Sequence, residues 1–302
     1  MVILAHSPYP ISRVARASVV VALVVTAIKA AASMLTGSVA LYSDALEGGV
    51  NVASALAVLL AVEYARHPPD DDHPYGHEKA EYLAAGFEGG LIVLAAVLIL
   101  YQASKAFFAV PELHGLGAGA AVNALAAVIN AGWGWYLVSR GRAWGSAALT
   151  ADGLHVLTDV WTSVGVLAGL ALAWLTGAWW LDPLMAVAVA VYILWAGYGL
   201  MRSSASGLLD EAASPEVQHQ VATAIRSHGV GAIQAHRIRT RKAGRMTFIE
   251  FHLVVPGSMT VEAAHAICDR IEHAVESAIP KAEVLIHIEP AHEAGEDGVI
   301  AI

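Results

Sequence analysis

The chain has 302 residues, of which 57% are hydrophobic and only 14% are charged. Soluble domains carry roughly 25% charged residues, so the composition excludes an ordinary soluble domain and predicts an integral membrane protein surrounded by the lipid bilayer. The net charge of −9, without a basic stripe, argues against nucleic-acid binding. The single Cys268 excludes an internal disulfide and a cysteine-rich metal site.

Long apolar runs occupy the first two-thirds of the chain. Runs of about 20 residues cross a bilayer as helices, and barrel strands are much shorter. The sequence GLGAG at 115–119 follows no strand and lacks the lysine of a phosphate loop, so we expect no nucleotide as a partner. We predict an α-helical membrane protein with six transmembrane helices: Val14–Leu35, Val39–Ala61, Tyr82–Phe108, Gly117–Val138, Ser146–Leu175 and Leu181–Met201.

Basic residues predict the orientation of these helices. They fall before the first span, in alternate loops and after the sixth span, and the intervening loops carry none. Cytoplasmic loops are enriched in Lys and Arg, so we expect both termini in the cytoplasm. Compact loops and the lack of a transit segment favour a bacterial inner membrane. The residues used are Arg13, Arg16, Arg66, Lys79, Arg140, Arg142 and Arg202.

Two of the predicted spans carry matching polar residues. SDALEGGVN (43–51) and ADGLHVLTD (151–159) align without gaps, which pairs Glu47 with His155 and Asn51 with Asp159. Residues four apart share a helix face, and four O and N ligands suffice for a divalent cation. Ionisable groups at membrane depth usually mark an ion pathway, although interhelical hydrogen bonds are the plainer alternative. Three further acids have no assigned role: Asp44, Asp152 and Glu88.

The loop RHPPDDDHPYGHEKAE forms a second candidate site. Asp70, His73 and His77 are spaced by three and four residues, and Gly76 permits a tight turn. A carboxylate with two imidazoles suits zinc or a similar cation. Spacing alone does not separate this site from a solvated acidic loop.

The tail differs in pattern from the rest of the chain. SPEVQHQVATAIRSH begins like a helix, with Ser214 as N-cap and Pro215 in the first turn. Two strands joined by a glycine turn, a helix capped by Thr260 and a final strand follow, so we expect a small α+β domain of order α-β-β-α-β. We divide the chain into a membrane domain at 1–206, this tail domain at 207–292 and a disordered tail at 293–302.

Histidines are concentrated on the predicted strands of the tail. His236, His252 and His287 each lie on a strand, and Glu289 shares a strand face with His287. His265 lies on the intervening helix. We interpret these residues as a metal-binding surface, with a dimerisation module bearing surface histidines as the alternative.

Taken together, these motifs resemble the cation diffusion facilitator family of divalent-metal/proton antiporters. The resemblance covers nearly the whole chain and includes SDAL, HPYGHEKAE, ADGLHVLTDV, AHRIRTR, IEFHL, EAAHAICD and IHIEP. It implies six transmembrane helices, a cytoplasmic α+β domain of metallochaperone type and a homodimer. It also implies a charge pair between Lys79 and Asp210 at the hinge. The implied metal sites are Glu47, Asn51, His155 and Asp159 in the membrane; Asp70, His73 and His77 in the loop; and His236, His252, His265, His287 and Glu289 in the tail.

Glu47 and Asn51 depart from the family pattern. Zinc-selective members usually carry His or Asp at the first of these positions and Asp at the second. A neutral amide and a longer carboxylate favour oxygen-rich coordination, which is more compatible with iron(II) or manganese. We therefore rank zinc first on the resemblance and these two metals next.

The chain is expected to be a transporter and not an enzyme. Its spans lack an HExxH pair and a nucleophile-elbow serine motif. Because no nucleotide site is present, we expect export of a divalent cation from the cytoplasm in exchange for protons, by alternating access. Divalent metals serve as substrate and regulator, and no catalytic cofactor is expected. The alternative is a non-transporting membrane sensor or scaffold with structural metal sites.

Overall fold

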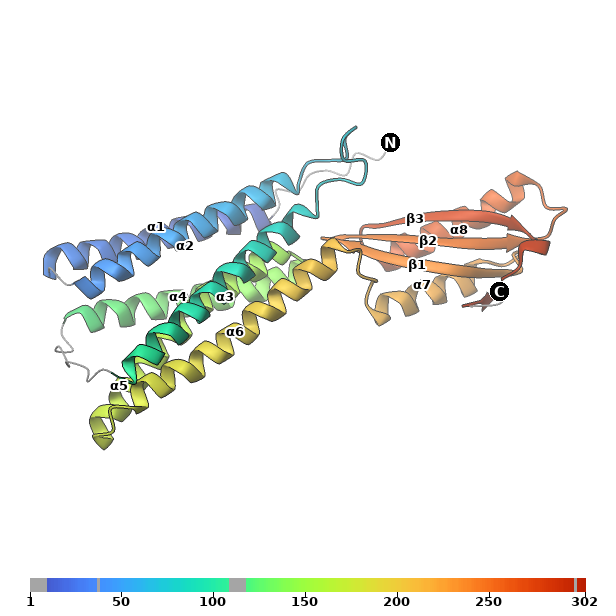
Figure 1. Cartoon of the computed structure of the whole chain (residues 1–302). Coiled ribbons are helices and arrows are strands. Elements are labelled where there is room, and N and C mark those ends of the chain that lie inside the picture. Colours follow the sequence, from blue (N-terminus) through green and yellow to red (C-terminus); the bar gives the residue numbers. More distant parts are fainter. Residues whose placement is uncertain (1–9, 37–38, 109–117, 296–297) are drawn as a thin grey trace. The chain divides into compact units, whose positions relative to one another are not determined.

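We describe the protein from a computed structural model, which defines residues 10–36, 39–108, 118–295 and 298–302. The chain separates into two compact units, Met1–Ala205 and Ser206–Ile302 (Figure 1). The start of the predicted fourth span at Gly117 and most of the preceding GLGAG stretch lie outside the described residues. Each unit is described by itself.

The first unit is built from long helices. Within the described residues, α1, α2, α3 and α6 contain segments long and apolar enough to cross a membrane. The prediction of a helical membrane domain followed by a small α+β domain is confirmed. The helices are α1 Pro10–Thr36, α2 Val39–Tyr64, α3 Ala80–Ala106, α4 Ala118–Trp144, α5 Ala147–Thr176 and α6 Leu181–Leu208 (Figure 1).

The helices pack pairwise through small residues. α1 packs along α2, α4 packs along α5, and α5 also contacts α3 and α2. The α4–α5 contact is close: a Cβ atom at Gly153 would lie 2.7 Å from the backbone N of Val138, and one at Gly141 would lie 2.6 Å from that of Thr150. Small residues let helix backbones approach in a membrane. This approach sets the position of α5, which carries His155.

The second unit is a four-stranded sheet with two helices. Its order along the chain is α7 Pro215–His228, β1 Gln234–Ala243, β2 Met246–Val255, α8 Val261–Ala278, β3 Ala282–Pro290, the 3₁₀ turn η1 Ala291–Glu293 and β4 Ile300–Ala301. The strand order across the sheet is β3-β2-β1-β4. β1 and β2 form an antiparallel hairpin, and β3 returns parallel to β2 through α8.

The helix caps differ from expectation at one end. Thr260 caps α8 and accepts a hydrogen bond from the N–H of Ala263 at 3.2 Å. Ser214 occupies the N-cap of α7 before Pro215, but its side chain makes no capping hydrogen bond. Proline at the first helical position therefore starts α7 without help from the hydroxyl.

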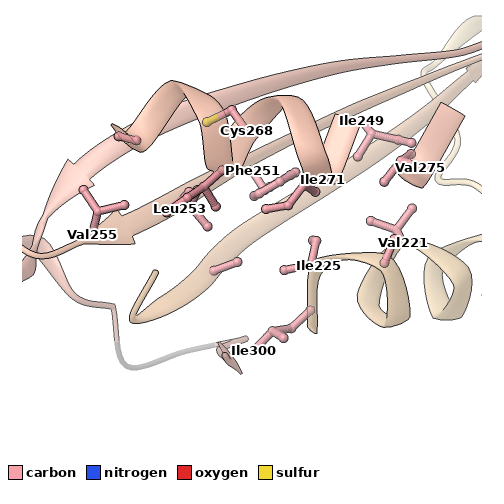
Figure 2. Packing of buried hydrophobic residues seen from close by; sticks show 14 of the residues in the cluster. Val221, Ile225, Ile249, Phe251, Leu253, Val255, Cys268, Ile271, Val275 and Ile300 are labelled. Atoms are coloured by element: carbon pink, nitrogen blue, oxygen red, sulfur yellow. The ribbon is translucent and has the colours of Figure 1, made fainter. Parts of the chain in front are cut away.

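Both helices of the tail unit cover one face of the sheet. Alternate β2 side chains, such as Phe251 and Leu253, pack against Val221 and Ile225 of α7 and Ile271 of α8 (Figure 2). Because successive strand residues point to opposite faces, His252 lies on the face away from this core. The face opposite the helices is thus left for the histidines.

The expected disorder of residues 293–302 is wrong for the described part of that segment. Ile300 and Ala301 form β4, which pairs antiparallel with Ala235 and Gln234 on the edge of β1. Ile300 is only 6% exposed and joins the core of the tail unit (Figure 2). A buried apolar side chain and an open strand edge order this end, and neither is visible in a two-residue strand pattern.

Candidate metal sites

The intramembrane site centres on His155, which is buried on α5. Its Nε2 lies 3.2 Å from Asn51 Oδ1 on α2. Asn51 Nδ2 in turn donates a hydrogen bond to Asp159 Oδ2 at 2.5 Å. Three of the four residues inferred from the two matching motifs therefore form one connected polar chain between α2 and α5.

Glu47, the fourth residue, is placed differently. It lies one turn before Asn51 on α2, and its side chain is exposed. Among the described residues, it belongs to no group of three or more acids, histidines or cysteines with ligand atoms within 4.8 Å. The structure thus joins Asn51, His155 and Asp159 by hydrogen bonds, with the exposed side chain of Glu47 one turn before Asn51 on α2.

Asp152 and Asp44 received no role from the sequence. Asp152 is buried and accepts a hydrogen bond from Ser18 Oγ at 2.6 Å. Ser18 Oγ also accepts a bond from Trp133 Nε1 at 3.1 Å. Asp152 therefore links α5 to α1 and, through Ser18, to α4. The side chain of Asp44 lies outside the described part of the structure.

Glu88, like Asp44 and Asp152, received no role from the sequence. Its side chain on α3 is fully buried, and Oε2 lies 3.4 Å from His155 Nδ1. Ser54 on α2 donates a hydrogen bond to Oε1. The signal was a carboxylate within GFEGG in an apolar run. The site prediction used pairs of polar residues four positions apart that match between two spans, and Glu88 belongs to no such pair.

A pocket borders this site. It lies among α1, α2, α4 and α5 and reaches both Asn51 and His155. Lys29, Asn130 and Asp152 also line it, among mostly apolar surface. The pocket thus brings several polar side chains next to the buried imidazole.

The loop residues form a compact set. Asp70 Oδ1 lies 3.3 Å from His73 Nδ1, and Asp70 Oδ2 lies 3.4 Å from His77 Nε2. His77 Nδ1 is 3.3 Å from the carbonyl oxygen of His67, which can only accept a hydrogen bond, and Nε2 faces Asp70. Gly76, with φ +81°, closes the turn. The ligand atoms of Asp70, His73 and His77 all lie within 4.8 Å of one another.

Asp70 is held in its charged form. The backbone N–H of His73 donates to Oδ1 at 2.6 Å, and this bond is the main reason that the pKa of Asp70 lies below its ordinary value of 3.8. The nearby His77 and His73 act in the same direction. A carboxylate that stays ionised suits a divalent cation.

The tail histidines lie in a row across the sheet. His236 faces His252 in the β1–β2 register, and His252 faces His287 in the β2–β3 register. Glu289 lies beside them: Oε1 is 2.6 Å from His252 Nδ1, and Oε2 is 3.3 Å from His236 Nε2. The ligand atoms of His236, His252 and Glu289 fall within 4.8 Å of one another.

This tail group fits a metal ion on its own geometry. His236 Nδ1 and Glu289 Oε2 are buried atoms with no hydrogen-bond partner in the part of the chain that the structure describes. His287 is more exposed, and its Nε2 lies 3.8 Å from Glu289 Oε1. Buried polar atoms without partners are costly unless an ion satisfies them. Imidazoles with a carboxylate are ligands that zinc and iron(II) accept.

His265 and the hinge pair are not gathered into this site. His265 lies on α8, exposed, with Nε2 3.6 Å from Asp269 Oδ1, and α8 covers the sheet face opposite His252. Asp210 pairs with Arg241 at 3.3 Å within the tail unit. Lys79 belongs to the first unit, at the start of α3. The pairing of Lys79 with Asp210 stays a prediction.

Comparison with known proteins identifies the family. The model of the cation efflux transmembrane domain matches residues 15–209, and that of the cation efflux protein cytoplasmic domain matches residues 213–291. The chain belongs to the cation diffusion facilitator, or cation efflux, family. The first match spans α1 to α6, and the second spans α7 to the start of η1.

Relatives in this family align over nearly their whole length. The uncharacterized transporter sll1263 of Synechocystis is 39% identical over 91% of this chain and 89% of its own. The cation-efflux pump FieF of Shewanella oneidensis is 31% identical over 91% and 92%, and that of Serratia proteamaculans is 32% identical over 91% of each chain.

Among solved structures, the zinc form of CzrB shares 38% identity, with a TM-score of 0.26, over 29% of this chain and 99% of its own. The metal-bound C-terminal domain of CzcD from Thermotoga maritima shares 26% identity, with a TM-score of 0.25, over 26% of this chain and 93% of its own.

Proposed function

We propose that this protein exports a divalent metal cation from the cytoplasm in exchange for protons, through the site around His155. The observation that carries the proposal is the polar chain Asn51–His155–Asp159, which has a buried histidine at its centre and joins α2 and α5 inside a membrane-spanning unit. Membership of the cation efflux family supports cation transport. Glu47 shares a helix face with Asn51 and would complete the ligand set by turning inward.

The charge of this site favours a divalent cation. Uncompensated carboxylates are costly in a low-dielectric interior, and a doubly charged ion neutralises two of them at once. Histidine changes its protonation near neutral pH, and a metal and a proton compete for the same imidazole lone pair. In the proposed cycle, metal binds while the site faces the cytoplasm, the helices rock, and protons displace the metal outward.

The tail site is proposed to regulate transport in a homodimer. The support is the compact His236, His252 and Glu289 group, which lies apart from the transport chain in sequence and in a separate unit. Because α8 covers the other face of the sheet, His265 could join such a site only from a second copy. We place the chain in a bacterial inner membrane with both termini in the cytoplasm, and the Lys79–Asp210 pair belongs to the same proposal.

Metal identity is proposed in the order zinc, then iron(II) or manganese. The ligand types around His155 include one imidazole and several oxygens, and such a mixed set accepts all three ions. Competition among zinc, iron(II), manganese and cobalt for uptake into everted vesicles ranks them directly. Zinc should compete most strongly.

Proteoliposomes carrying a pH gradient test the transport proposal. His155→Ala and Asp159→Ala should each lower zinc flux by at least about tenfold, because loss of groups at a metal site costs 10- to 100-fold. His219→Ala, an exposed histidine on α7, is the matched control and should transport normally. Normal flux in both site variants would refute the assignment. Metal binding without flux in the wild type would instead indicate the sensor or scaffold alternative.

A further inference from the structure

Glu88 is an acid buried at a place where an uncompensated charge is costly. Its side chain is 0% exposed and belongs to the apolar helix α3. Ser54 supplies one hydrogen bond to Oε1. Oε2 has no hydrogen-bond partner among the described residues. A buried carboxylate oxygen left in this way calls for a proton or a cation beside it.

The hydrogen bonds around Asn51 determine which nitrogen of His155 faces Glu88. Asp159 can only accept, so the amide nitrogen of Asn51 is the group that donates to it. The amide oxygen is then left for His155, and Nε2 must carry the proton that it shares with this oxygen. In the neutral imidazole, Nδ1 is then the nitrogen without a hydrogen. It is buried, and the described residues offer it no hydrogen-bond partner.

With neutral His155, two electron-rich atoms face one another. His155 Nδ1 and Glu88 Oε2 are 3.4 Å apart, beyond the range of about 2.7–3.2 Å for an N–H···O bond. A proton on Nδ1 would make this contact an ion pair. A tetrahedral ion with metal–ligand bonds of about 2.1 Å separates neighbouring ligand atoms by about 3.4 Å, so the observed separation also fits two adjacent ligands of one metal ion.

We propose that Glu88 is a ligand of the transported cation, paired with His155 Nδ1, and that Asn51 is a positioning residue that orients His155. This inference rests on the proposed transport site and refines it. Glu88 from α3 supplies the negative charge that the neutral amide at position 51 lacks. If Glu88 takes the place of the exposed Glu47, the two carboxylates Glu88 and Asp159 balance a doubly charged ion.

The assignment also explains why an amide at position 51 is useful. An aspartate there could only accept hydrogen bonds, so it could not donate to Asp159 while accepting from His155. Asn51 does both, and in doing so it turns Nδ1 toward α3. A hydrogen bond to the other ring nitrogen fixes the tautomer of a metal-binding histidine.

Direct zinc binding to the purified full-length chain tests the proposal. The background carries His77→Ala and His252→Ala, so that the loop and tail sites do not contribute. Glu88→Gln should lower zinc affinity by at least about 100-fold, and Glu88→Asp by about tenfold. Loss of a residue that only hydrogen-bonds a metal ligand already lowers metal affinity 10- to 100-fold, so loss of a ligand should cost at least as much. The control is Glu81→Gln, because Glu81 is another buried acid of α3 but accepts its hydrogen bond from Ser146. This control should keep wild-type affinity.

A charge-relocation variant separates a ligand from a structural residue. Glu88→Gln combined with Asn51→Asp returns a carboxylate to the site as a direct ligand, but it removes the hydrogen bond to Asp159 that orients His155. The double variant should therefore recover about tenfold, and not all, of the lost affinity, because neighbouring residues in one site couple strongly. A purely structural Glu88 predicts additive losses. This double variant and Glu88→Asp keep the test usable if Glu88→Gln alone fails to fold.

The outcomes distinguish this inference from the transport proposal. Loss of binding in His155→Ala with wild-type affinity in Glu88→Gln would overturn the role of Glu88 and leave the transport site standing. Wild-type binding and flux in His155→Ala would overturn both. Loss in Glu88→Gln with recovery in the double variant supports the assignment.

Discussion

The close packing of α4 against α5 allows a sharp test of how the metal site is positioned. Gly153 lies two residues before His155, and a Cβ atom there would meet the backbone N of Val138 at 2.7 Å, where 3.4 Å is an ordinary contact. Gly153→Ala must therefore move the helices apart by about 0.7 Å. Overpacking of this kind costs about 1–3 kcal/mol. The shift also exceeds the tolerance of about 0.5 Å for a functional site.

Thermal unfolding and zinc flux measure both consequences. A loss of about 2 kcal/mol of unfolding free energy corresponds to a fall in Tm of about 4–8 °C for a unit of this size. Zinc flux should fall in the same variant. Gly132→Ala on α4 is the matched control, because its new Cβ would have no heavy atom within 4 Å. Equal Tm and equal flux in the two variants would refute the packing argument.

Three further predictions concern the tail unit. In a urea titration, Thr260→Ala should lower the unfolding free energy by about 1 kcal/mol, because the Thr260 hydroxyl caps α8. Ser214→Ala should lower it by less, because the Ser214 side chain makes no capping hydrogen bond. Zinc at about 100 times its dissociation constant should stabilise the unit by about 2.7 kcal/mol; calorimetry should show that Glu289→Gln removes this effect and that His219→Ala keeps it. Burial raises the pKa of Cys268 to about 11, so the thiol stays protonated at pH 8, and maleimide labelling followed by mass spectrometry should be at least tenfold slower than in urea. Rapid labelling of the folded chain would show that Cys268 is not buried.

The order of elements could be predicted from local patterns. Apolar runs of bilayer length placed the long helices, because a helix in lipid must be continuous and apolar over that distance. Pro215, Thr260 and the Gly244 turn marked where the tail elements begin and end. These signals act over a few residues, so no tertiary information is needed to interpret them.

The loop site and most of the tail site were also accessible from spacing. Asp70, His73 and His77 come together because a tight turn brings nearby residues close. His252 and His287 come together because neighbouring strands share a register. His265 was grouped with them, yet α8 packs on the opposite face. Which face of the sheet a helix covers depends on the core, and spacing does not contain that information.

The composition and motifs by themselves predicted a membrane protein that resembles the cation efflux family, with polar residues at matching positions on two spans, Glu47 and Asn51 on one and His155 and Asp159 on the other. Tertiary structure alone decided that Glu88 of α3 lies 3.4 Å from His155 and that Glu47 is exposed. The physical reason is that helical periodicity shows which residues share a face, whereas only packing between helices decides which faces meet.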